Sequence, residues 1–347
     1  MTELLVSSSP HIRSRVTTRR LMLDVIIALT PCLIAGIVFF GWYALALTAI
    51  SVGTAVATEF VYALVYRKAW KDFKGAVRHI IKDFDLTSVI SGMILALIVP
   101  VTVEWYLPLL GSIFSIALCK MLFGGTGRNL VNPAATARIF LFISFSSMTS
   151  YVGTCVIPAL VAPGADVTEI LSGATPLTAL FQKEGGVTLG LADLFLGSGV
   201  DGCIGETCKL AILVGFLWLI VRRVIKWYYP LIYIGVTGLF AVALQGFDFT
   251  YFMPSILSGG LLFGAVFMAT DYSTSPKSTA ANVVYFVCLG LLTAGLRKAT
   301  GIEVVSFCIL LMNCLTPLLD RYLPRRPFGY VREKKVKAPA AAKEGKA

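Results

Sequence analysis

The amino-acid sequence predicts an all-α integral membrane protein with about ten transmembrane helices, arranged as two inverted five-helix repeats. Composition is the first observation behind this class. Of the 347 residues, 57% are hydrophobic and only 14% are charged, whereas a soluble domain usually carries about 25% charged residues. The second observation is that the apolar residues form blocks approaching the roughly 20 residues that a helix needs to cross a bilayer.

Ten apolar blocks are candidate spans. They lie at 21–40, 43–66, 86–100, 104–122 and 134–150, and then at 209–227, 229–245, 252–270, 280–297 and 302–320. The third and fifth blocks are short, so they can be partial or tilted spans. The blocks divide the chain into an N-terminal arm (1–20), a first five-helix half (21–150), an intervening segment (151–208), a second five-helix half (209–320) and a basic, disordered tail (321–347).

The net charge of +11 fits the rule that cytoplasmic segments accumulate Lys and Arg. With a cytoplasmic N-terminus, 26 of the 30 basic residues fall on the cytoplasmic side, Lys120 and Arg138 among them. The segment 151–208 holds one Lys against six acidic residues, which places it outside. We therefore expect both termini in the cytoplasm. The basic residues form no groove with interleaved aromatic residues, so no nucleic-acid partner is expected.

The two halves of the sequence are alike at one point. Residues 88–99 (SVISGMILALIV) and 255–266 (SILSGGLLFGAV) each begin the third block of a half. Because five is an odd number, a second half built in the same way enters the membrane inverted, and such repeats often place a site at their interface. Chance similarity between two apolar helices is the alternative.

Neither metal nor hydrolytic chemistry is indicated. The two histidines are far apart, and no Cys/His cluster has the spacing of a structural zinc site. Most of the eight cysteines lie in apolar blocks, where Cys usually acts as a small buried hydrophobe. Cys203 and Cys208 lie just before the sixth block. They can form a disulfide in an oxidising compartment or bind a ligand, but we expect free thiols.

The most informative stretch is Ser172-Gly173-Ala174-Thr175, followed by Pro176. One interpretation is local, with Thr175 as the N-cap and Pro176 as the first residue of a helix. The other follows from the backbone N–H groups at a helix N-terminus, which favour a phosphate.

This stretch resembles the flavin-attachment motif of a membrane flavoprotein family. The family contains the D subunit of the Rnf ferredoxin:NAD oxidoreductase and the B subunit of the sodium-pumping NADH:quinone oxidoreductase. The resemblance runs from about residue 7 to 330, through SSPH (8–11), LFGGTGRNLVNPA (122–134), GETC (205–208), FMATD (267–271) and PLLD (317–320). The family pattern usually has Asp six residues before the threonine, where this chain has Glu169. The lack of a long N-terminal extension favours the Rnf member of the family.

The resemblance implies that a flavin transferase outside the cytoplasm esterifies the Thr175 oxygen to the phosphate of FMN, giving a phosphoryl threonine. Ser172, Gly173 and Ala174 complete the attachment motif. The protein would be a subunit in a bacterial or archaeal cytoplasmic membrane, receiving electrons from a second covalent-flavin subunit. Its complex would couple electron transfer between ferredoxin and NAD to movement of Na+ or H+. No residue of this chain would act as a catalyst in turnover.

Further residues are candidates for a second, non-covalent flavin such as riboflavin. They are Arg128, Asn129 and Asn132 after the fourth block, Asp271 after the eighth, and Glu206 before the sixth. The turns that hold the first four can equally contact a partner subunit or simply cap loops.

Asp24 in the first apolar block and Glu59 in the second are the clearest acidic residues within membrane spans. Charged groups inside a bilayer usually mark a pathway or a partner, so both are candidates for the ion pathway. Alternatively, Asp24 lies close enough to the membrane edge to remain hydrated, and Glu59 serves a helix–helix contact.

Three competing functions stay open at this point. The first is a solute channel or transporter, because the expected fold resembles that of urea channels and fold does not fix function. The second is the equivalent subunit of a sodium-pumping NADH:quinone oxidoreductase. The third is a scaffold for partner subunits.

Overall fold

The computed structural model describes residues 17–66, 77, 84–151, 177, 180, 190–197 and 200–324. In these residues the regular secondary structure is helical, without a β-strand. The prediction of an all-α protein is therefore confirmed.

The first group of helices covers the first half of the chain. It contains α1 (Thr18–Phe40), α2 (Trp42–Tyr66), α4 (Thr87–Leu97), α5 (Tyr106–Ile113), the π-helix η1 (Phe114–Met121), α6 (Pro133–Ser144) and the 3-10 turn η2 (Ser146–Thr149). Helix α1 begins after Thr17, whose side chain accepts a hydrogen bond from Arg20 N. Such a side chain satisfies one of the backbone N–H groups that the first turn of a helix leaves unpaired.

The second group of helices follows the segment 151–208. It contains α8 (Leu191–Leu196), α9 (Lys209–Val221), α10 (Tyr228–Leu244), the 3-10 turn η4 (Phe249–Tyr251), α11 (Phe252–Leu257), α12 (Leu261–Phe263), the π-helix η5 (Gly264–Met268), α13 (Thr279–Thr300) and α14 (Val305–Tyr322). Each of the ten predicted blocks therefore contains helix.

Helix length limits what can cross a membrane. Within the part of the chain that the structure describes, three helices, α1, α2 and α13, are long and apolar enough to span a bilayer, and the bent pair 249–257 and 261–268 makes a fourth if it counts as one span. Helix α4 has 11 residues, or about 16 Å at 1.5 Å per residue, which is about half of the ~30 Å hydrocarbon layer. These helices make the protein an integral membrane protein, and ten complete crossings stay a prediction.

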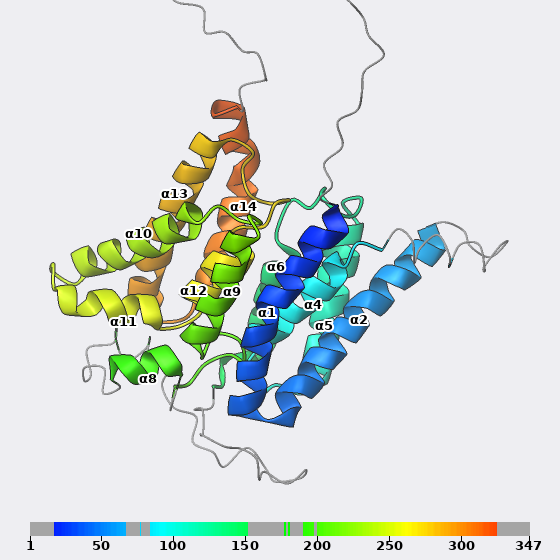
Figure 1. The fold of residues 1–347 in the computed structure, drawn as a ribbon, viewed down its shortest axis with the longest axis horizontal. Helices are drawn as coiled ribbons and strands as arrows, with labels where there is room; N and C mark the ends of the chain where they lie inside the picture. Colours follow the sequence, from blue (N-terminus) through cyan, green and yellow to red (C-terminus); the bar gives the residue numbers. More distant parts are fainter. Residues whose placement is uncertain are drawn as a thin grey trace, which may run out of the picture.

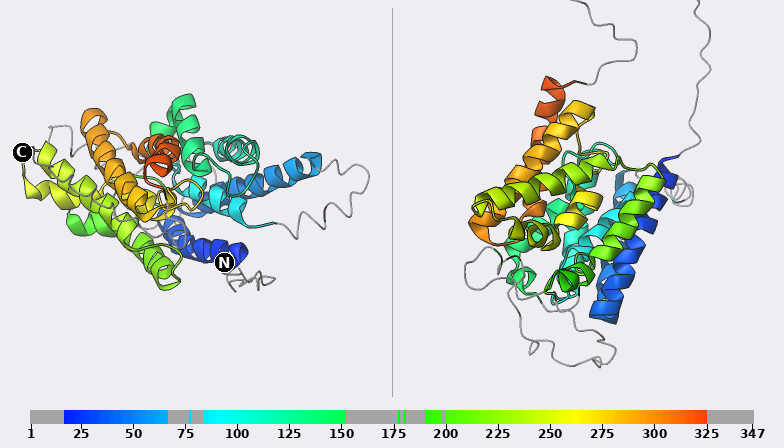
Figure 2. Two further views of the ribbon diagram at one scale, coloured as in Figure 1. Left: turned by 90° about the horizontal axis from the view of Figure 1, so that it is seen from above. Right: turned by 60° about the vertical axis from the view of Figure 1, so that its left-hand side comes forward.

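Both groups pack in the same pattern. In the first group α2 packs against α4 and α5, and α5 against α6. In the second group α10 packs against α11 and α13, and α13 against α14. The groups meet through helices at equivalent places in each half, α1 against α9 and α6 against α14 (Figures 1 and 2).

The chain ends and the intervening segment lie at opposite ends of the bundle. The start of α1 and the end of α14 both lie at the top of Figure 1, whereas α8, within the segment 151–208, lies at the bottom. We call these the terminal end and the α8 end of the bundle.

The prediction of one continuous helix over 252–270 is wrong. Helix α11 ends at Leu257, α12 begins at Leu261, and the two parts are bent by 67°. The break occurs because Gly259 adopts a φ of +66°, which a residue with a side chain rarely adopts. The matching stretch 88–99 begins within the continuous helix α4, so the two similar sequences have different conformations here.

Candidate functional site

A cavity of about 390 Å³ lies between the two groups of helices at the terminal end of the bundle. Ligand sites in proteins usually have volumes of about 300–1,000 Å³, mostly apolar walls and a few polar groups. Apolar side chains such as Ile94 and Phe267 line part of this wall. The polar lining includes Thr87, Lys120, Thr126, Asn129, Asn132 and Asp271. The structure thus brings three of the predicted site residues, Asn129, Asn132 and Asp271, to one cavity.

Asn132 and Asn129 play different parts in this cavity. Asn132 Oδ1 caps α6 by accepting hydrogen bonds from Ala134 N at 3.1 Å and Ala135 N at 3.3 Å. Its Nδ2 donates to the carbonyl of Met268 at 3.1 Å, which ties the first half to the second. Asn129 Oδ1, in contrast, is buried and accepts no hydrogen bond from any described residue. A buried acceptor is costly when unpaired, so Asn129 offers a ligand a hydrogen-bond partner.

Asp271 lies in the turn that follows η5. Its Oδ2 accepts hydrogen bonds from Ser273 Oγ at 2.8 Å and Thr274 Oγ1 at 3.3 Å. Burial raises the pKa of Asp271, and these hydrogen bonds offset only part of that effect. Asp271 therefore shapes its own turn and also adds a carboxyl group to the cavity wall.

Lys120 lies in η1, on the same wall, and is almost completely buried. Its Nζ donates to Glu59 Oε1 at 2.7 Å, Thr87 Oγ1 at 2.5 Å and Ser88 Oγ at 3.1 Å. Asp85 Oδ1 lies 3.9 Å from the same nitrogen. Burial raises the pKa of Asp85, but hydrogen bonds from Thr126 and Thr87 and the charge of Lys120 outweigh it and leave the pKa below its ordinary value. Glu59 is thus paired inside the bundle.

Asp24, the other acidic residue of the first two spans, also has a basic partner. Its Oδ1 accepts a hydrogen bond at 3.0 Å from Arg222 Nε, at the end of α9. Asp24 is 6% exposed, so its charge is stabilised by this pair and not by full hydration.

The remaining predicted site residues do not line the cavity. Arg128 is exposed and lies outside the lining. Ser172, Gly173, Ala174 and Thr175 lie outside the described residues.

Glu206 does not line the cavity and belongs to a second polar cluster, next to the break between α11 and α12. Its Oε1 accepts a hydrogen bond from Cys203 N at 3.0 Å, and its backbone carbonyl accepts one from Lys209 Nζ. Its Oε2 is buried without a hydrogen-bond partner among the described residues. A Cβ atom on Gly260 would lie 2.3 Å from this oxygen, so the carboxylate reaches the break only because residue 260 is a glycine.

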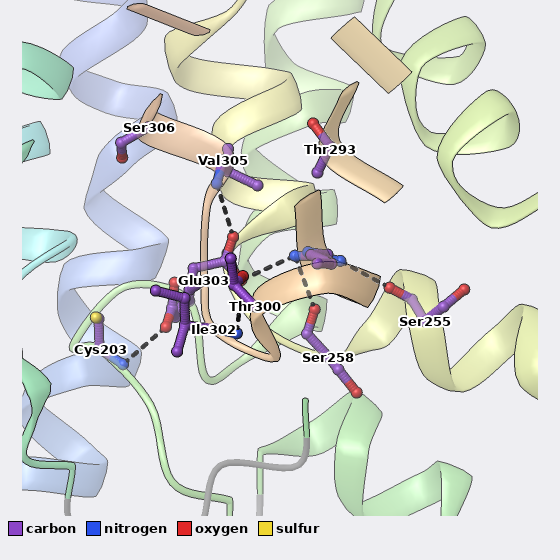
Figure 3. Close-up of polar contacts among 12 residues, drawn as sticks. Cys203, Ser255, Ser258, Thr293, Thr300, Ile302, Glu303, Val305 and Ser306 are labelled. Atoms are coloured by element: carbon purple, nitrogen blue, oxygen red, sulfur yellow. Dashed lines mark hydrogen bonds and ion pairs between the residues drawn. The ribbon is translucent and has the colours of Figure 1, made fainter. Parts of the chain in front are cut away.

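Arg297 and Glu303 also contact the break, and Figure 3 shows Glu303 together with Ser255 and Ser258 of the broken segment. Arg297 Nη2 lies 2.8 Å from Glu303 Oε2, and Arg297 Nη1 donates to the carbonyl of Ser255 at 3.0 Å. Glu303 Oε2 also accepts a hydrogen bond from Gly260 N at 2.9 Å. The ion pair therefore satisfies backbone groups that the interrupted helix leaves without partners.

Arg138, which we expected among the cytoplasmic basic residues, is buried inside the protein and does not lie in a solvated loop. Arg138 is 5% exposed and belongs to the same cluster as Cys203, whose Sγ lies 3.7 Å from its Nη2. Its Nη1 lies 3.4 Å from Ser306 Oγ. Arg138 is in the middle of α6, so a tertiary contact and not the positive-inside rule accounts for it. The side chain of Lys120 is likewise enclosed by the protein.

The expectation of free thiols at Cys203 and Cys208 is confirmed, because neither forms a disulfide. Among the described residues, no group of three or more His, Cys, Asp and Glu side chains is placed to hold a metal ion.

Four buried charged residues of these two clusters were not predicted as site residues from the sequence. Lys120, Arg138 and Arg297 all lie within apolar blocks, and Glu303 lies at the start of the last one. A charge inside an apolar block usually has a partner, so the basic residues in the blocks could have been paired with the acidic ones. We instead used the basic residues to assign sides of the membrane, and so did not look for acidic partners inside the blocks.

The fold and the cavity define a helical membrane protein in which the two halves of the chain jointly form a ligand-sized site with apolar walls and a few polar groups. The chain belongs to the NQR2, RnfD, RnfE family, whose model matches residues 5–329.

Three relatives, each the D subunit of a multi-subunit complex, show how far the similarity extends. The one from the Na(+)-translocating ferredoxin:NAD(+) oxidoreductase complex of Acetobacterium woodii is 41% identical, over 96% of this chain and 97% of its own length. The one from the proton-translocating ferredoxin:NAD(+) oxidoreductase complex of Clostridium ljungdahlii is 32% identical, over 93% and 96%. The one from the ion-translocating oxidoreductase complex of Stutzerimonas stutzeri is 36% identical, over 95% and 96%. The resemblance to the Rnf proteins is therefore confirmed over nearly the whole chain.

Proposed function

We propose that this protein is a membrane electron-transfer subunit that carries FMN covalently bound to Thr175. Its complex would couple electron transfer between ferredoxin and NAD to translocation of Na+ or H+. The observation that carries this proposal is full-length similarity to the D subunits of such complexes, together with the Ser-Gly-Ala-Thr stretch at 172–175. The names of the first two relatives differ in the ion, so either ion fits this chain.

Thr175 would act as a nucleophile once, on an extracytoplasmic flavin transferase: its Oγ1 would lose its proton and attack the phosphorus of an FMN group in an activated donor, and the bond from that phosphorus to the donor's leaving group would break. After that the ester retains the cofactor at the membrane surface. The flavin supplies the redox chemistry. The electron donor would be a second covalent-flavin subunit of the complex, and the chain itself would bind and orient the cofactor.

The proposed topology has ten spans in two inverted halves, with both termini in the cytoplasm and the segment 151–208 outside. The matching packing of the two groups supports the repeat, since a two-fold relation brings equivalent helices together. The position of α8 at the opposite end from the start of α1 and the end of α14 supports the sidedness (Figure 1). A cytoplasmic membrane of a bacterium or archaeon is the expected location.

The cavity at the terminal end is proposed to bind a second, non-covalent flavin such as riboflavin. Its residues fit such a group: the apolar wall suits a flat aromatic ring, and the unpaired Oδ1 of Asn129 can accept a hydrogen bond from a ring N–H. Asn132 and Asp271 would hold the shape of the wall, because their side chains already bond the loops around it. Arg128 and Glu206 do not line this cavity and stay candidates for contacts elsewhere.

Asp24 and Glu59 stay proposed members of the ion pathway. Each forms an ion pair, Asp24 with Arg222 and Glu59 with Lys120. An ion that binds either carboxylate must therefore compete with a basic side chain, which would make binding reversible.

Replacing Asn129 with leucine should release the non-covalent flavin and leave the covalent one in place. Leucine removes the acceptor and leaves the ligand N–H unpaired, which should weaken binding about tenfold or more. The measurement is the flavin released by acid extraction, relative to the flavin that stays with the denatured protein. Arg128→Met, in the same loop but outside the cavity lining, is the control and should retain the wild-type ratio. An unchanged ratio in Asn129→Leu would refute the cavity as the flavin site.

A further inference from the structure

Lys120 lines the proposed flavin cavity, and the partly buried carboxylates of Glu59 and Asp85 lie beside it. All three N–H bonds of the Lys120 ammonium are taken, by Glu59, Thr87 and Ser88. Lys120 is 1% exposed, so it cannot turn outwards into water. Lys120 therefore holds its charge at a fixed place in the wall and has no free N–H with which to bind a ligand directly.

The cluster contains one positive and two negative groups. The Glu59 carboxylate lies 2.7 Å from Lys120 Nζ and the Asp85 carboxylate 3.9 Å from it. Lys277, the other basic residue of the cavity lining, is exposed, where water and salt screen its charge. Asp271 lines the cavity from the second half of the chain. Among these groups, Lys120 is the one buried positive charge.

We propose that the cluster of Glu59, Lys120 and Asp85 sets the reduction potential of the flavin bound in the cavity. The inference rests on the proposed function, because it requires a flavin there. Each electron delivered by a reduced carrier of the complex adds one negative charge to the ring, unless a proton from water follows it. The buried ammonium of Lys120 in the wall stabilises that charge, and the carboxylate of Glu59 behind it opposes that charge. Lys120 therefore acts on the flavin through its charge, which raises the potential, and the charge of Glu59 lowers it.

The test uses the purified full-length chain with the Thr175→Ala change, supplied with riboflavin, so that the cavity holds the flavin under study. Spectroelectrochemical titration gives its midpoint potential. Lys120→Met removes the positive charge and should lower the midpoint potential. At a fixed applied potential, the ratio of reduced to oxidised flavin should fall about tenfold. Glu59→Gln removes one negative charge and should raise the potential by a similar factor.

The double variant Lys120→Met/Glu59→Gln restores the net charge of the wild-type cluster. Its potential should return close to the wild-type value, which a merely structural role of the pair would not produce. Lys298→Met is the control for loss of a lysine that does not line the cavity, and it should leave the potential unchanged.

Each outcome decides one of the two proposals. If the chain without either cluster change binds no riboflavin, the proposed flavin site fails, and this inference fails with it. If riboflavin binds but Lys120→Met and Glu59→Gln shift its potential in the same direction, or not at all, the inference is wrong while the site stands. If Lys120→Met does not fold, Glu59→Gln decides alone, and an unchanged or lowered potential overturns the inference.

Discussion

Replacing Thr175 with alanine is expected to abolish covalent flavin in this protein completely. Alanine has no side-chain oxygen, so no ester to the FMN phosphate can form at that position. The measurement is flavin fluorescence of the protein band on a denaturing gel, after expression together with the flavin transferase. Thr178→Ala changes a threonine three residues further on and should leave the fluorescence at the wild-type level.

The same gel separates the competing functions. Fluorescence that survives Thr175→Ala would place the flavin on another residue. A wild-type band without fluorescence, in the presence of the transferase, would favour the solute channel. Loss of electron transfer in an intact complex that contains Thr175→Ala would exclude a pure scaffold.

Replacing Arg297 with methionine is expected to cause the largest loss of stability, about 3–5 kcal/mol. The change leaves Glu303, 2.8 Å away in the wild-type protein, as an unpaired carboxylate in a buried place. It also removes the donors to the carbonyls of Ser255 and Ser258 beside the helix break. Thermal unfolding of the purified protein in detergent measures the effect.

The neighbouring Lys298 provides the control. Its Nζ bonds Gln245 Oε1 at 2.8 Å, away from the break, and Lys298→Met should change stability by less than about 1 kcal/mol. The double change Arg297→Met/Glu303→Gln should recover part of the lost stability, because it removes the unpaired charge. If Arg297→Met melts at the same temperature as Lys298→Met, the ion pair does not hold the break.

Most of the fold could be predicted from sequence because apolar blocks and helices coincide in a membrane protein. The short third block proved to be the 11-residue helix α4. The break between α11 and α12 could not be predicted, because glycine pairs also occur inside membrane helices. The break is stabilised by Glu303, whose carboxylate accepts a hydrogen bond from Gly260 N although the two residues are more than 40 positions apart in the chain.

The cavity was partly predictable. Asn129, Asn132 and Asp271 stood out as polar groups that follow apolar blocks, and the structure places them together. Lys120 was assigned to the cytoplasmic side by its charge, since nothing local shows that Glu59, 61 residues earlier, is its partner. Pairing between distant helices determines which charges are buried, and a single sequence does not contain that pairing.

The most direct test of the central claim is the intact mass of the purified protein after expression with the flavin transferase. The account predicts a mass above that of the polypeptide by one FMN less one water, and the polypeptide mass alone for Thr175→Ala. An unmodified wild-type mass, in cells where the transferase loads another flavoprotein, would contradict it.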